Sequence, residues 1–137
     1  MPTQQNPNAG TTRQSGAGSR LTILFVEDQV LVRFSSADLL RGEGHEVIEA
    51  ANGSEALSLI DAGLEFDLLV SDIRMPGAID GLELIRLATE RHPGLPMLLV
   101  SSEPSRANAS RTPFLQKPYS DDALLKAVQG AFNRNER

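Results

Sequence analysis

Hydrophobic positions along the chain follow two alternating patterns after residue 20. Short apolar runs, rich in residues that favour strands, occupy 21–26, 46–50, 66–70, 96–100 and 114–117. Stretches with apolar residues at helical spacing occupy 29–42, 52–62, 82–91 and 120–132. Because short apolar runs predict buried strands and a period of 3.6 predicts amphipathic helices, we expect strands and helices to alternate.

Polar residues mark where three of the predicted helices begin. Asn52 stands three residues before Glu55, which is capping-box spacing, and Asp80 and Ser120 precede later amphipathic stretches. Side-chain oxygens at such positions accept hydrogen bonds from the free amides of a first helical turn. Helices that start after Asn52, Asp80 and Ser120 are therefore predicted.

The order of the elements predicts the fold class. Strands separated by single helices favour parallel pairing, and right-handed crossovers place helices on both faces of the sheet. We expect an α/β fold over residues 21–137, a three-layer doubly wound sheet of five parallel strands. Residues 1–20 are rich in Gly, Pro, Ser, Thr, Asn and Gln, a composition that predicts a disordered N-terminal tail.

The segment before the last strand is too short for a full helix. Only residues 102–113 separate Ser101 from Phe114, and Pro104 and Pro113 lie among them. A helix takes about 11 residues and each of its connections about 2–6. We therefore expect the fourth helix to be missing or reduced to a turn.

Charge and composition exclude several classes of function. The chain of 137 residues has 13 Lys and Arg, 18 Asp and Glu, a formal net charge of −5 and no cysteine. An acidic chain argues against binding nucleic acid or an anionic membrane through bulk charge. Without cysteine there are no disulfides, thiolate metal sites or cysteine nucleophiles. No apolar run approaches the ~20 residues that span a bilayer and no secretory signal is evident, so a cytoplasmic location is expected.

Polar side chains gather where the predicted strands end. Glu27 and Asp28 follow the first strand, Asp72 the third, Ser101 the fourth and Lys117 the fifth. The carboxyl ends of parallel strands share one edge of a sheet, where function collects. Three carboxylates there repel one another unless a cation neutralises them, and oxygen ligands favour Mg²⁺. A carboxylate can also be the nucleophile toward a phosphoryl group whose oxygens the metal and lysine neutralise.

These residues lie in short strings that resemble the receiver domain of bacterial response regulators. The strings are FVED, SDIRMPG followed by DGLEL, LLVSS and FLQKPY, and the resemblance covers about residues 21–134. It implies the flavodoxin-like (CheY-like) strand order 2-1-3-4-5. It also implies a phosphoprotein of two-component phosphorelay signal transduction, which catalyses only its own phosphorylation and dephosphorylation and is otherwise not an enzyme.

The resemblance implies roles for the residues at the strand ends. Asp72 corresponds to the phosphoacceptor and Lys117 to the cation that pairs with the phosphoryl group. Mg²⁺ would be held by Asp28, Asp72 and the backbone carbonyl of Arg74, with Glu27 acting through water.

Further positions correspond to switching and to phosphoryl lifetime. Ser101 matches the hydroxyl that moves toward the phosphoryl group, and Phe114 matches the aromatic residue that turns inward with it. Arg74 and Glu103, two residues after the phosphoacceptor and the hydroxyl, match the positions that tune lifetime. We expect their opposite charges to pair across the mouth of the site, and we expect Pro118 to be cis.

Some features depart from the family pattern or lie outside it. Residues 77–79 make the loop after the third strand one residue longer than usual, which we interpret as a surface insertion. His45 and His92 are predicted to lie on the surface, and Arg106 and Arg111 to be solvated. A reduced fourth helix removes part of the usual dimerisation surface, so a monomer or a weak dimer that does not use that face is expected.

The sequence favours a stand-alone, single-domain response regulator. It would take a phosphoryl group from a histidine kinase or a histidine phosphotransfer protein, and its output protein is not specified. It would act by a conformational switch, by passing the phosphoryl group onward or as a phosphate sink, with neither nucleic acid nor membrane as partner. A fragment of a hybrid kinase or larger regulator is the alternative, which the initial Met1 weakly disfavours.

Three other functions are less consistent with the residues. An aspartate-nucleophile phosphatase would carry a second Asp where Arg74 stands. A flavin or nucleotide binder would carry a Gly-rich loop after the first strand, and the string FVEDQV would repel a phosphate without metal. A receiver that only scaffolds would not need the intact set of Asp28, Asp72, Ser101 and Lys117.

Overall fold

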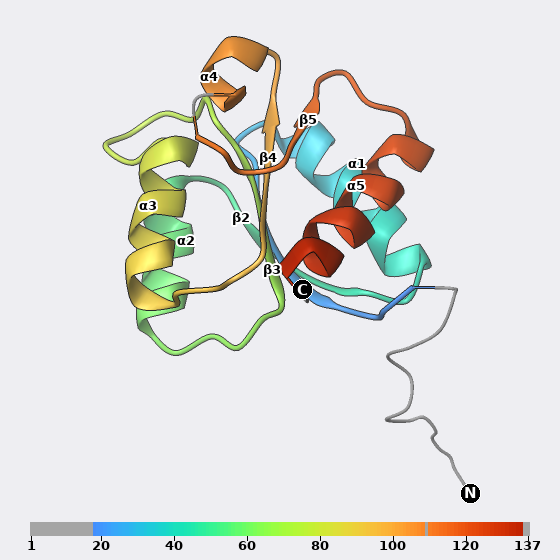
Figure 1. Ribbon diagram of the computed structural model, residues 1–137, viewed down its shortest axis with the longest axis horizontal. Helices are drawn as coiled ribbons and strands as arrows, with labels where there is room; N and C mark the ends of the chain where they lie inside the picture. Colours follow the sequence, from blue (N-terminus) through green and yellow to red (C-terminus); the bar gives the residue numbers. More distant parts are fainter. Residues whose placement is uncertain (1–17, 109, 136–137) are drawn as a thin grey trace, which may run out of the picture.

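Five parallel strands form one sheet, with the first strand of the chain inside it (Figure 1). The structure is a computed structural model and describes residues 18–108 and 110–135. The strands are β1 (Thr22–Val26), β2 (Glu46–Ala50), β3 (Leu68–Asp72), β4 (Met97–Ser101) and β5 (Phe114–Gln116). Their order is β2-β1-β3-β4-β5, with every pair parallel. The predicted sheet and its order are confirmed.

Helices cover both faces of the sheet, which makes three layers (Figure 1). The long helices are α1 (Val30–Gly42), α2 (Gly53–Asp61), α3 (Gly81–Arg91) and α5 (Asp121–Asn135). Helices α2 and α3 lie on one face, and α1 and α5 on the other. Leu24 and Leu69 are buried in one core cluster, whereas their neighbours Phe25 and Val70 are buried in the other. The central strands are apolar on both sides for this reason, which explains their unbroken hydrophobic runs.

The helix starts predicted from polar residues are confirmed. The side chain of Asn52 accepts a hydrogen bond from the Glu55 amide at 2.8 Å. The side chains of Asp80 and Ser120 accept bonds from the amides three residues later, at 2.9 and 3.1 Å. The Glu55 carboxylate in turn accepts from the Ala51 amide at 2.6 Å, which completes a box-like pair of contacts.

The fourth helix is much shorter than the others. Helix α4 (Pro104–Asn108) has five residues, little more than one turn. The fully buried Ala107 ties it to the core cluster that contains Leu99. The expected reduction is therefore observed, although the helix is not absent. Between α4 and β5, Arg111 has a backbone φ of 64°, in the left-handed region.

His45 is buried, so the prediction that it lies on the surface was wrong. Its side chain is 7% exposed, and its Nδ1 accepts a hydrogen bond from the Leu21 amide at 2.9 Å. The Leu21 carbonyl accepts from the Glu46 amide, which places the residue before β2 directly beside the start of β1. His92, by contrast, is exposed as predicted.

The longer loop after β3 is only partly a surface insertion. Gly77 and Ala78 are exposed, but Ile79 is half-buried and packs against the core cluster beneath α2. A Cβ atom on Gly53 would lie 2.3 Å from the Ile79 carbonyl oxygen. The loop is therefore seated against the first residue of α2, where a side chain would displace it.

Residues 1–17 of the predicted tail lie outside the described residues. Within residues 18–20, the backbone of Ser19 is hydrogen-bonded to the side chain of Gln129 in α5. The Ser19 amide donates to Oε1 at 3.2 Å and its carbonyl accepts from Nε2 at 2.8 Å. Among the described helices, none is long and apolar enough to cross a membrane.

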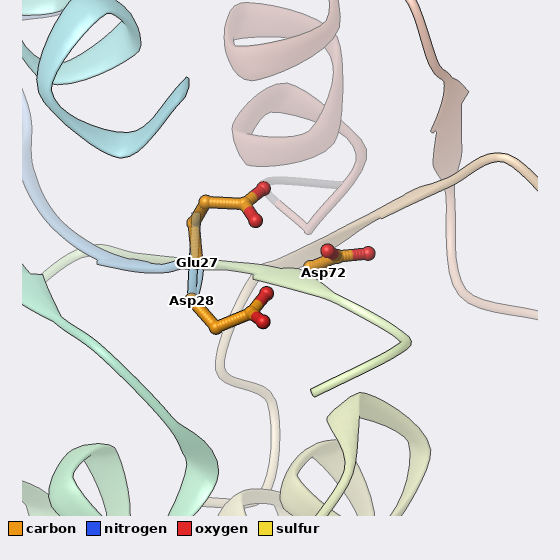
Figure 2. A group of neighbouring side chains, drawn as sticks. All are labelled: Glu27, Asp28 and Asp72. Carbon is orange, nitrogen blue, oxygen red and sulfur yellow. The ribbon is translucent and has the colours of Figure 1, made fainter. Parts of the chain in front are cut away.

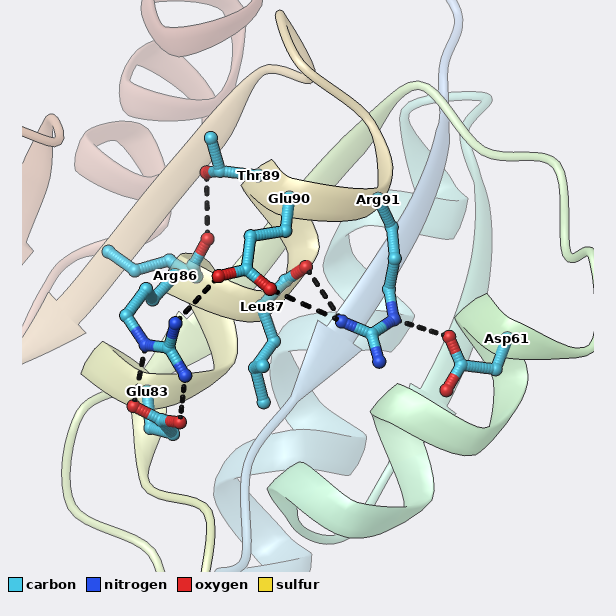
Figure 3. A network of polar contacts seen from close by, with 8 residues as sticks. Asp61, Glu83, Arg86, Leu87, Thr89, Glu90 and Arg91 are labelled. Atoms are coloured by element: carbon cyan, nitrogen blue, oxygen red, sulfur yellow. Dashed lines mark hydrogen bonds and ion pairs between the residues drawn. The ribbon is translucent and has the colours of Figure 1, made fainter.

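Ion pairs join the outer surfaces of α2 and α3 (Figure 3). Arg86 contacts Glu83 and Glu90 on its own helix, and Arg91 reaches across to Asp61 at the end of α2. Exposed pairs of this kind contribute little to stability, because water and salt screen their charges.

Candidate functional site

Three carboxylates converge at the ends of β1 and β3 (Figure 2). Glu27 and Asp28 directly follow β1, and Asp72 is the last residue of β3. One oxygen from each residue lies within 4.8 Å of the others. Glu27 is 1% and Asp72 7% exposed, so two of these charges are buried. The structure thus brings together the acidic residues that the sequence predicted at one edge of the sheet.

Backbone pairing continues past the strand ends and holds these residues in place. The Glu27 amide donates to the Ala50 carbonyl at 3.1 Å, which prolongs the pairing of β1 with β2. The Ile73 amide donates to the Val100 carbonyl at 3.1 Å, beyond the last residue of β3. Glu27 and Asp72 therefore extend from the hydrogen-bonded edge of the sheet rather than from a free loop.

Lys117 bridges two of the three carboxylates. Its Nζ donates to Glu27 Oε1 at 2.9 Å and to Asp72 Oδ2 at 3.0 Å. Its amide donates to the Ser101 carbonyl at 2.9 Å, so Lys117, directly after β5, lies beside the end of β4. The peptide bond to Pro118 is cis, as expected.

The electrostatics of the cluster follow from burial and from this bridge. Burial raises the pKa of Glu27 and outweighs the hydrogen bonds from Lys117 and the Gln29 amide, which lower it. Burial would lower the pKa of Lys117, but its hydrogen bonds to Glu27 and Asp72, together with their charges, raise it overall. The lysine therefore stays a cation at neutral pH.

The donor set suits a hard divalent cation. Counted as three carboxylates and one ammonium, the cluster has a formal charge of −2. A divalent ion neutralises that charge, and carboxylate oxygens are the ligands that Mg²⁺ prefers. The residues present therefore fit the magnesium ion that the sequence predicted.

The start of α3 packs directly against the phosphoacceptor candidate. A Cβ atom on Gly81 would lie 2.1 Å from the Asp72 carbonyl oxygen and 2.7 Å from the Ile73 Cα. The Gly81 amide donates to the Ile73 carbonyl at 2.8 Å. Only glycine allows this approach, so the helix and the end of β3 are held as one unit.

Ser101 is buried at the end of β4, and its hydroxyl bonds to its own loop. The Oγ accepts from the Glu103 amide at 2.7 Å and donates to the Glu103 carbonyl at 3.2 Å. Phe114, the candidate switch aromatic, is half-buried and packs against the core cluster that contains Ala107. A move of Ser101 toward Asp72 would release these bonds, while its role as a switch stays a prediction.

Charged residues from three segments meet beside the site. Arg74 pairs with Glu103 at 3.1 Å, the pairing expected from the sequence. Arg106 of α4 contacts Glu103 at 3.6 Å and also bonds Asp80 at 3.1 Å, so the prediction that it is simply solvated was wrong. Asp80 caps α3 with its other oxygen. The sequence carried no local signal for this contact because 26 positions separate Arg106 from Asp80.

Comparison with known proteins identifies the class. Residues 23–129 match the family described as the response regulator receiver domain, and the chain belongs to that family. It is 34% identical over 123 residues to the chemotaxis protein CheY of Pseudomonas aeruginosa, which covers 83% of this chain and 98% of that protein. The structure of a response regulator receiver protein from Sinorhizobium medicae covers 85% of this chain and 97% of its own, with a TM-score of 0.79 and 25% identity.

One relative is far longer than this chain. The sensor kinase CckA of Brucella abortus is 35% identical over 122 residues, which make up 84% of this chain but 13% of that protein. This chain therefore corresponds to only a small part of that kinase. What the family establishes is a receiver domain of two-component signalling, which is not a conventional enzyme.

Proposed function

We propose that the chain is a response-regulator receiver that accepts a phosphoryl group on Asp72. The observation that carries this proposal is the buried Asp72 carboxylate, which lies against Lys117 and within a cluster of three acids. An Asp72 oxygen attacks the phosphorus of a phosphohistidine and the phosphorus–nitrogen bond breaks. The imidazole leaves with the electrons of that bond and takes up a proton.

The remaining residues have supporting roles in this proposal. Asp28, Asp72 and the Arg74 carbonyl would hold Mg²⁺, with Glu27 acting through water. The ion would neutralise charge on the phosphoryl oxygens. When Asp72 is phosphorylated, Lys117 contacts a phosphoryl oxygen in place of part of its present contact with the Asp72 carboxylate. Ser101 donates its hydroxyl to another oxygen, and Phe114 follows it inward.

The phosphoryl donor is a histidine kinase or a phosphotransfer protein, and we propose that it docks on α1. Val30, Leu31 and Phe34 are 61, 81 and 59% exposed, an unusual set of large apolar side chains on one helix. A groove lined by Leu31, Tyr119 and Lys117, among others, connects this apolar face to the site. A partner seated there would present its phosphohistidine to Asp72. The similarity to part of a sensor kinase supports such a partner.

After phosphorylation, the chain signals through a conformational switch, onward transfer or storage of the phosphoryl group. The reduced α4 favours output as a monomer or as a weak dimer that does not use the α4 face. The five residues of α4 offer little surface for a symmetric interface, which commonly buries about 800 Å² per partner.

Incubation with acetyl phosphate and Mg²⁺, followed by intact mass measurement, tests the proposal. We expect a mass gain of one phosphoryl group that requires Mg²⁺ and disappears in Asp72→Asn. Asp67→Asn is the matched control, because Asp67 contacts the Thr22 amide at the opposite end of the sheet and should leave the labelling unchanged. If the wild-type chain gains no mass while a control receiver is labelled, the proposal is wrong.

A further inference from the structure

Arg33 of α1 contacts the backbone of Glu27 rather than one of the three carboxylates of the site. Its Nη1 donates to the Glu27 carbonyl at 2.9 Å, and its Nε donates to Glu49 Oε1 at 3.1 Å. Its side chain is 17% exposed and that of Glu49 is 24% exposed, so solvent screens these contacts only in part. The guanidinium thus connects the end of β1, the start of α1 and a residue of β2.

The Glu27 carbonyl completes a set of contacts that fixes this residue. The Glu27 amide is bonded to Ala50, Oε1 accepts from Lys117 at 2.9 Å, and Oε2 accepts from the Gln29 amide at 3.1 Å. The carbonyl belongs to the planar peptide that leads into Asp28. Its direction therefore helps to set where the Asp28 side chain leaves the backbone.

Glu49 is itself anchored from a second side. Arg41 pairs with Glu49 Oε2 at 3.1 Å and donates to the Val47 carbonyl at 2.8 Å. Arg33 therefore bonds to a carboxylate held on β2, not to a mobile surface acid. The planar fork of arginine can bridge a carboxylate and a carbonyl at fixed angles, which the single ammonium of lysine does not reproduce.

We propose that Arg33 is a positioning residue for the magnesium site, acting through the Glu27 carbonyl on the orientation of Asp28. This inference rests on the function proposed above. If Arg33 positions the site, its removal weakens Mg²⁺ binding. A purely electrostatic effect would instead strengthen binding, because it removes a positive charge near the dication. Positioning and charge can therefore be separated by experiment.

The test measures the dissociation constant of Mg²⁺ by calorimetry, without a phosphoryl donor. We expect Arg33→Ala and Arg33→Lys both to weaken binding about tenfold, as loss of an outer partner of a metal ligand does. Arg41→Ala is the matched control, since it removes a guanidinium from the same Glu49 and should change binding less than about twofold. Urea unfolding without Mg²⁺ measures the stability of each variant, and Arg33→Lys carries the test where Arg33→Ala does not fold.

Three outcomes would overturn the inference. Tighter or unchanged Mg²⁺ binding in both Arg33 variants would show that Arg33 does not position the site. Equal weakening in Arg41→Ala would assign the effect to Glu49 and β2 instead. Failure of the wild-type chain to bind Mg²⁺ would remove the proposed metal site and this inference together, which distinguishes that failure from the first two.

Discussion

His45 is a buried base whose ring accepts a backbone hydrogen bond. Nδ1 must be unprotonated to accept from the Leu21 amide, so protonation breaks a contact that joins β1 to the residue before β2. Burial lowers the pKa of His45, Glu43 raises it in part, and Arg20 lowers it further. The neutral ring is therefore the form that the fold stabilises.

A pH dependence of stability follows from the lowered pKa of His45. In the unfolded chain the imidazole has a pKa of about 6.5, so below that pH the unfolded state binds more protons than the folded state. The stabilisation is fully present above about pH 6.5 and is lost as the pH falls toward the lowered folded pKa. Urea unfolding at pH 7.5 and 5.5 measures it. His45→Asn, which keeps an acceptor but does not titrate, should lose less stability over this interval, and equal losses would contradict the prediction.

Residues differ in how far their roles could be predicted from the sequence. Glu27, Asp28 and Asp72 each follow a recognisable strand, and parallel strands bring their carboxyl ends to one edge, so their convergence was predictable. The contacts of His45 and Arg33 depend on how side chains from separate elements pack. Neither leaves a periodic or spacing signal, and both became apparent only from the three-dimensional structure.

At the scale of elements, the short helix α4 is held at its start by charge. Arg74 in the loop after β3 pairs with Glu103, which directly precedes α4. Arg106 within α4 bonds Asp80 at the start of α3. The sequence predicted the length of α4, because the residue count between β4 and β5 leaves no room for more. It did not predict how so short a helix is anchored.

The Arg74–Glu103 pair is expected to shield the phosphoryl group from water. Arg74→Ala should shorten the half-life of phosphorylated Asp72 by up to about fivefold, since an exposed pair is worth ~0–1 kcal/mol. The decay is followed by intact mass after acetyl phosphate is removed. Arg86→Ala, which breaks exposed pairs on the outer face of α3, is the control and should leave the half-life unchanged. Equal half-lives for the wild type and Arg74→Ala would refute the shielding role.

At the scale of the whole molecule, the site and the apolar face of α1 lie on one continuous surface. Val30, Leu31 and Phe34 are the exposed large hydrophobic residues of the described chain, and all three lie on α1, which begins two residues after the acidic pair. The reactive carboxylates thus lie at the edge of the sheet, and an exposed apolar surface for binding a protein lies beside them on α1. A small phosphoryl donor needs only the carboxylate site, whereas a protein donor needs both the site and the apolar face of α1.

This difference separates recognition of the donor from the chemistry of the site. In Leu31→Ser and Phe34→Ala, the rate of phosphorylation by an autophosphorylated histidine kinase that labels the wild-type chain should fall at least about tenfold, as truncation of interface anchors does. Phosphorylation by acetyl phosphate should stay at the wild-type rate, because neither Leu31 nor Phe34 belongs to the cluster of charged residues around Asp72. Glu90→Ala, on the outer face of α3, is the control for a surface change remote from α1. A parallel fall with both donors would mean that the substitutions disturb the site itself, and an unchanged kinase rate would place the docking surface elsewhere.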